Sequence, residues 1–124
     1  MPHLMISHSG NVRVEQPEAL LLQANQALYQ TGLFKTSQEI KSRIKTDAQA
    51  VIGLNEQDQA YIHAQFYILK GRDLAQQQQL AACLDQVLTA AQYHADSSVE
   101  LQICTEIIEI EAQSYIKSLK TISA

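Results

Sequence analysis

The stretch AYIHAQFYILKGRDLAQQQQLAACLDQVLTAA, residues 60–91, decides the fold. Its first ten residues alternate between two faces, which predicts a strand with Ile62, Ala64, Phe66 and Ile68 on the apolar side. Gly71 and Arg72 then turn the chain. Asp73 is placed to cap a helix, with Gln76 in the capping-box position. The stretch therefore predicts a strand, a tight turn and a long amphipathic helix whose buried stripe is Leu80, Leu84, Val87, Leu88 and Ala91.

The preceding half of the chain shows the same order of elements. Residues 3–8 predict a short strand, and Pro17 suits the first turn of a helix that Gly32 ends. Residues 40–45 alternate between apolar or small and basic side chains, which predicts a strand with one basic face. Residues 46–59 give no clear pattern beyond a turn at 55–58.

After the second helix, residues 99–110 predict a last strand. We expect it to be interrupted near Thr105 and Glu106, where the alternation changes phase. The tail, residues 115–124, is short and could pack on a neighbouring chain.

The two halves, about 1–59 and 60–124, superpose at an offset of about sixty residues, so that Leu20 matches Leu80 and Arg13 falls against Arg72. Parallel strands joined by a helix form a right-handed crossover unit. Two such units predict a single α+β domain, residues 1–124, with a four-stranded sheet and two helices on one face. The other face of the sheet is then uncovered, and we expect oligomerisation to bury it.

Composition narrows the class of protein. A chain of 124 residues with 46% hydrophobic residues suits one folded domain, and its net charge of −4 argues against a nucleic-acid binder. No secretory signal or membrane-spanning stretch is recognisable, so we expect a cytoplasmic protein. Cys83 and Cys104 lack the spacing of a metal site or a disulfide framework, and we expect two buried thiols.

Pro2 is the candidate for chemistry. If Met1 is removed, as happens when a small residue follows it, the Pro2 nitrogen becomes a free secondary amine. An α-amino group titrates near ~7.7–8.0, and an apolar pocket would lower its pKa further. Such an amine could act as a general base near neutral pH. A proline at position two can equally be an ordinary residue, so the interpretation depends on the rest of the chain.

The chain resembles the tautomerase superfamily and, within it, the 5-carboxymethyl-2-hydroxymuconate isomerases. The resemblance rests on the opening Met1-Pro2-His3, the turn Ser9-x-Asn11-Val12-Arg13, the pair Ser42-Arg43, and Gly71-Arg72 ahead of a Gln-rich helix. It covers nearly the whole chain and is weakest over 46–59 and the tail. His8 and Gly10 depart from the family pattern, which bears on specificity more than on reaction type.

The resemblance implies a trimer whose sheets face inward, with Pro2 at the base of a pocket shared between subunits. It implies a keto–enol isomerase of homoprotocatechuate catabolism that needs no cofactor and no metal. Its substrate would be 5-carboxymethyl-2-hydroxymuconate or a similar small carboxylate.

Cations must hold such a substrate, because the net charge of the chain will not attract it. Arg13, Arg43 and Arg72 each stand near a strand end or a turn, and a guanidinium pairs with a carboxylate at two points. The alternative for each is a solvated surface arginine, and for His3 a packed strand histidine. For the whole chain, the alternative is a non-catalytic trimer of the same fold that binds a ligand or a partner.

Overall fold

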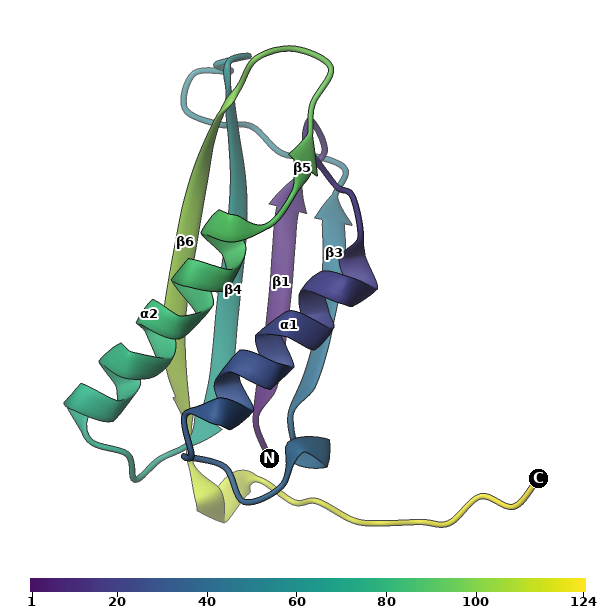
Figure 1. Ribbon diagram of the computed structural model, residues 1–124, viewed down its shortest axis with the longest axis vertical. Coiled ribbons are helices and arrows are strands. Elements are labelled where there is room, and N and C mark those ends of the chain that lie inside the picture. The colour runs from purple at the N-terminus through teal and green to yellow at the C-terminus, as the bar shows by residue number, and fades with distance from the viewer.

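The computed structural model describes residues 1–124, and both long helices cover the same face of one sheet (Figure 1). The fold is therefore the predicted α+β arrangement. Its main elements are β1 (His3–Ser9), α1 (Pro17–Gln30), β3 (Lys41–Asp47), β4 (Gln59–Leu69), α2 (Leu74–Ala90) and β6 (Glu100–Ile110). Two single-turn 3-10 helices, η1 (Ser37–Glu39) and η2 (Ala112–Ser114), precede β3 and follow β6.

The sheet order is β3-β1-β4-β6. β1 pairs parallel with β3, and β4 pairs parallel with β6, so each half of the chain is one β-α-β unit. The two units join through the antiparallel pair β1–β4. The predicted tandem of crossover units is confirmed, and it brings the start of β1 and the end of β4 to the same end of the sheet.

The core lies between the sheet and the helices. Leu20, Ala24 and Leu28 of α1 are buried at the same spacing as Leu80, Leu84 and Leu88 of α2. They pack on the fully buried side chains of β4, which are those predicted for its apolar face. Each buried leucine contributes roughly 1.5–3 kcal/mol relative to an exposed one.

The helix ends follow the predicted signals. Pro17 stands in the first turn of α1, and Gly32 has a φ of 78° just after the helix, a conformation that other residues adopt at a cost. Asp73 caps α2: its carboxylate accepts from the Gln76 backbone N–H at 2.8 Å, while the Gln76 side chain accepts from the Asp73 N–H at 3.0 Å. This reciprocal pair is the predicted capping box.

Three expectations need correction or completion. β6 runs without interruption in register with β4 from Glu100 to Ile110, so the predicted break at Thr105 is wrong. Cys104 is exposed on this chain, whereas Cys83 is partly buried. No sequence pattern predicted the small antiparallel pair formed by the two-residue strands β2 (Arg13–Val14) and β5 (Tyr93–His94).

The face of the sheet away from the helices is open to solvent. It carries Met5, which is 38% exposed, and the basic side chains of β3, Lys41, Arg43 and Lys45. The tail after η2 runs away from the body of the molecule, with Ile116, Leu119 and Ile122 almost fully exposed (Figure 1). Neither helix has the length and apolar character needed to cross a bilayer.

Candidate active site

Pro2 is buried where the chain enters β1. Its carbonyl accepts a hydrogen bond from the Lys41 backbone N–H at 3.2 Å, which fixes it beside the start of β3. The proline borders a cavity of about 230 Å³ that is also lined by Leu33, Phe34, Glu39, Ile68 and Arg72. The cavity therefore collects residues from the start of β1, the loop after α1, the end of β4 and the turn before α2.

Arg72 is held in this cavity by two contacts. Its Nη2 donates to the carbonyl oxygen of Leu33 at 2.8 Å, and its guanidinium carbon lies 4.7 Å from the centre of the Phe34 ring. Phe34 packs edge-on against the buried Phe66, with ring centres 5.8 Å apart. A guanidinium over an aromatic face is stabilised by the ring quadrupole. The side chain is thus fixed while its charge is not neutralised by a carboxylate.

The amine at the start of the chain lies in the same region. The Met1 ammonium is 3.5 Å from a Glu39 carboxylate oxygen. Burial, and next the charge of Lys41, lower the pKa of this amine from its ordinary value, while Glu39 acts in the opposite direction. With Met1 in place the Pro2 nitrogen is an amide. The Pro2 residue itself is buried next to this amine.

Arg43 lies on the open face of the sheet and reaches the site through His3. Its Nη1 is 3.5 Å from His3 Nδ1, and His3 Nε2 is 2.7 Å from the hydroxyl of Tyr115. Burial first, and then the charges of Lys41 and Arg43, lower the pKa of His3. Arg43 therefore contacts the residue after Pro2, whereas Arg72 lines the cavity that Pro2 borders.

Arg13 lies at the opposite end of the sheet. It is exposed, and its Nη2 makes an ion pair with Asp96 at 3.1 Å. It borders another cavity, of about 330 Å³, together with His8, Lys45 and Thr46. Within one chain, Pro2 and Arg72 share a cavity, whereas Arg43 lines a separate one on the open face of the sheet and Arg13 a third.

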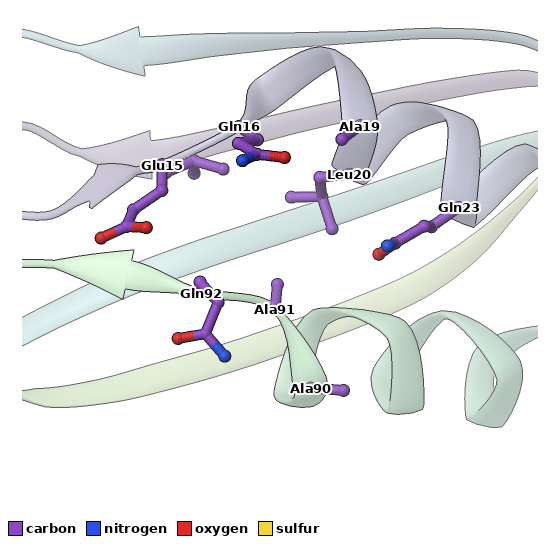
Figure 2. Close-up of a pocket in the computed structure, with 9 residues that line it drawn as sticks. Glu15, Gln16, Ala19, Leu20, Gln23, Ala90, Ala91 and Gln92 are labelled. Atoms are coloured by element: carbon purple, nitrogen blue, oxygen red, sulfur yellow. The ribbon is translucent and has the colours of Figure 1, made fainter.

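Figure 2 shows a further cavity, of about 310 Å³, between the start of α1 and the residues that follow α2. Its polar lining is Glu15, Gln16, Gln23 and Gln92, with Leu20 and small residues completing it. The single charged lining group, Glu15, would repel an anion. This cavity has no lysine or arginine in its lining, whereas Arg72 and Lys35 line the Pro2 cavity.

Sequence reasoning missed three contributors to the Pro2 cavity and its surroundings. Phe34 and Glu39 belong to the connection between α1 and β3, which carried no motif. Tyr115 belongs to the tail and meets His3 across 112 positions in sequence. Only the pairing of strands brings these residues to Pro2, and no local pattern could have signalled it.

The comparison with protein families gives a match over residues 2–121, to the family described as 5-carboxymethyl-2-hydroxymuconate isomerase. No curated protein matches the chain.

Solved structures agree with the family match in fold. A 5-carboxymethyl-2-hydroxymuconate isomerase from Deinococcus radiodurans R1 is 21% identical, with a TM-score of 0.78 over 96% of this chain and 90% of that one. A 5-carboxymethyl-2-hydroxymuconate delta-isomerase is 18% identical, with a TM-score of 0.72 over 97% of this chain and 89% of the other. A fused 4-OT symmetric trimer is 18% identical, with a TM-score of 0.68 over 90% and 88% of the two chains.

Proposed function

Because the chain belongs to the 5-carboxymethyl-2-hydroxymuconate isomerase family, and is thus an isomerase of the tautomerase type, we propose that Pro2 is its general base. The substrate would be 5-carboxymethyl-2-hydroxymuconate or a similar 2-hydroxydienoate of homoprotocatechuate catabolism. The observation that carries this proposal is the shared cavity of the buried Pro2 and the unneutralised guanidinium of Arg72.

The reaction needs one base and no redox partner. The Pro2 amine takes the proton of the 2-hydroxyl group, and the O–H electron pair forms the carbonyl as the conjugated double bonds shift. The same nitrogen then returns the proton to a remote carbon. A base with a pKa near the working pH serves both steps, since it must accept and release the same proton. Burial and the charge of Lys41 lower the pKa of the Met1 amine, and we expect the same surroundings to act on a Pro2 amine once Met1 is removed.

Arg72 and Arg43 are proposed to have different roles in the reaction. In the reaction, negative charge develops on the 2-oxo group and must be stabilised by donors that are already oriented. Arg72 is proposed for this, because the Leu33 carbonyl and the Phe34 ring orient its guanidinium beside Pro2. Arg43, on the open side of the sheet, is proposed to hold a more distant carboxylate.

We propose that the working unit is a homotrimer. The open face of the sheet requires a cover, and related solved structures include fused 4-OT trimers. A cavity of about 230 Å³ is also smaller than the roughly 300–1,000 Å³ of ordinary small-molecule sites, as expected if a neighbour completes it. In that arrangement Arg13 of a neighbouring copy would be available to the site. Light scattering that gave a monomer at micromolar concentration would contradict the trimer.

Two measurements test the function. Intact mass of the purified protein shows whether Met1 is absent, which is the precondition for a free Pro2 amine. Turnover of a 2-hydroxydienoate, followed by the loss of its conjugated absorbance, is then compared between the native protein and Pro2→Ala. Equal turnover in both, or full activity in protein that retains Met1, would show that another group is the base. No turnover by native protein that lacks Met1 would favour the non-catalytic binding role.

A further inference from the structure

Three side chains from distant parts of the sequence are in contact at His3, the residue that follows Pro2. His3 opens β1, Arg43 lies on β3, and Tyr115 follows η2 at the end of the fold. The Tyr115 hydroxyl is 2.7 Å from His3 Nε2, and Arg43 Nη1 is 3.5 Å from His3 Nδ1. The imidazole therefore stands between a hydroxyl and a guanidinium, with one ring nitrogen facing each.

The chemistry of the partners fixes the proton on the ring. A guanidinium can only donate, so His3 Nδ1 must present its lone pair to Arg43. A neutral imidazole then carries its proton on Nε2, which donates to the Tyr115 oxygen. The neutral form is favoured because burial lowers the pKa of His3, and because the charged groups acting on it, Lys41, Arg43 and the N-terminal ammonium, are all cations. From β4, the residue opposite His3 is Tyr67, which brings no charge that would favour an imidazolium.

We propose that Tyr115 and His3 are positioning residues for Arg43, so that the C-terminal segment forms part of the carboxylate-binding side of the site. This inference rests on the proposed function, in which Arg43 holds a remote carboxylate. The hydrogen bond that Arg43 donates to His3 restrains one edge of the guanidinium, and the opposite N–H groups are left for a two-point contact with a carboxylate. Without Tyr115 the imidazole can turn or change tautomer, and Arg43 loses its orientation.

The environment of Tyr115 supports a role in the site. Tyr115 is half-buried, whereas every residue after it is exposed. Its ring also lies against the His3 ring, with centres 6.0 Å apart and planes at 59°. The tail is thus fastened to the body at His3, one residue from the proposed base.

The test uses the full-length protein and heptanedioate, an unreactive dicarboxylate, as the probe in an NMR titration. Tyr115→Phe keeps the ring and removes only the hydroxyl. We expect it to weaken binding by about three- to tenfold, the range for one lost hydrogen bond. Tyr29→Phe is the matched control, since Tyr29 is exposed on α1, and it should bind as the native protein does.

A double-mutant cycle separates positioning from a general effect of the tail. If Tyr115 acts through Arg43, then Tyr115→Phe should cause no further loss in an Arg43→Ala background. Independent, additive losses, native binding by Tyr115→Phe, or no binding of heptanedioate by the native protein would each overturn the proposal. The ¹⁵N shifts of the His3 ring give a second readout: the native ring should be protonated at Nε2 alone, and a ring protonated at Nδ1 would also overturn it.

The outcome is distinguishable from failure of the proposed function. Turnover and its dependence on Pro2 test the function, whereas dicarboxylate binding and the His3 tautomer need no turnover. A protein that binds heptanedioate through Arg43 and Tyr115 without converting a hydroxydienoate would refute the base and keep this inference. Normal, Pro2-dependent turnover together with additive losses of heptanedioate binding in the Tyr115→Phe and Arg43→Ala variants would refute this inference and keep the proposed base.

Discussion

Arg13 and Arg72 stand at matching points of the two β-α-β units, each in the connection that leads from a strand to a helix, yet their surroundings differ. Arg72 is half-buried over the Phe34 ring and donates to a backbone carbonyl. The Arg13 side chain is 57% exposed and is paired with the carboxylate of Asp96. The repeat therefore reproduces the backbone but not the site.

The difference arises from which segment of the chain lies beside each turn. The turn at Arg72 lies at the end of the sheet where the chain starts, so Pro2 can enter its cavity. The turn at Arg13 lies at the end where β4 begins, and there the chain is continuous through Asp58 and Gln59. Only the first end can therefore offer a chain-terminal amine. An exposed ion pair such as Arg13–Asp96 contributes only about 0–1 kcal/mol, so a neighbouring copy could still redirect Arg13.

The largest effect is expected from replacing Pro2, the proposed base, which lies at only one of the two ends of the sheet. Pro2→Ala replaces the secondary amine of a rigid ring by a more mobile primary amine with a different pKa, and kcat should fall by about a hundredfold or more. Gln59→Ala, at the start of β4, is the matched change at the other end and should leave kcat near native. Circular dichroism and light scattering should show unchanged fold and assembly in both. A native kcat in Pro2→Ala would show that the end of the sheet with Pro2 does not supply the base.

The next effect compares the two arginines directly. Arg72→Ala should lower kcat/KM by roughly ten- to a hundredfold, because a charge-assisted hydrogen bond contributes about 1.5–3 kcal/mol. Its kcat should fall too if it stabilises charge on the 2-oxo group. Arg13→Ala should cost less unless a neighbouring copy brings Arg13 to the site. An effect equal to that of Arg72→Ala would thus indicate a shared site.

Lys45→Ala is the control for general loss of positive charge, because Lys45 is exposed on β3 near Asp47. It should change kcat/KM little. Near-native kinetics in Arg72→Ala, with assembly intact, would show that other residues hold the substrate.

How much of this could be predicted depends on the range over which each signal acts. The helices, their buried stripes and the capping box at Asp73 follow from local spacing, and the structure confirms them. The apparent break in β6 came from the neighbours Ile107 and Ile108, which are both partly buried. Ile107 pairs with the buried Phe66, and Ile108 pairs with Tyr67 on the other face, so the strand is apolar on both sides there. The change of phase in the sequence therefore marks a strand end that is apolar on both faces, and not an interruption of the strand.

The candidate site was predictable only in part, for a related reason. The family-like motifs pointed to Pro2 and three arginines, and one chain brings Pro2 and Arg72 together. The contacts that orient the cations, from Phe34, from the Leu33 carbonyl and from Tyr115, come from connections and from the tail. Such contacts depend on which strands become neighbours, and this is a property of the whole sheet.

The pH dependence sharpens the contrast by reporting on the amine at the Pro2 end. Burial and then the charge of Lys41 lower the pKa of the Met1 amine in the folded chain, and we expect the same surroundings to act on a Pro2 amine once Met1 is removed. Only the neutral amine can accept a proton. The activity, as kcat/KM, should therefore rise with pH through a value below the ordinary ~8 and level off above it, changing about tenfold per unit on the acid side. Glu39 raises the pKa of the Met1 amine and lines the Pro2 cavity, so Glu39→Gln should shift this limb to lower pH. A limb centred above pH 8 would contradict a desolvated base.

The smallest effect concerns the helices that follow the two turns. Asp73 caps α2 through a reciprocal pair with Gln76, whereas Gln16 at the start of α1 makes no side-chain cap. Asp73→Ala should therefore lower the free energy of unfolding by about 1 kcal/mol, measured by urea denaturation, while Gln16→Ala should change it little. Conversely, Gln16→Asp should raise it by a few tenths of a kcal/mol or more, because a carboxylate there can accept from the free N–H groups and suits the positive end of the helix dipole. Equal losses in Asp73→Ala and Gln16→Ala would mean that the packing of the helix starts, and not the cap, distinguishes the two units.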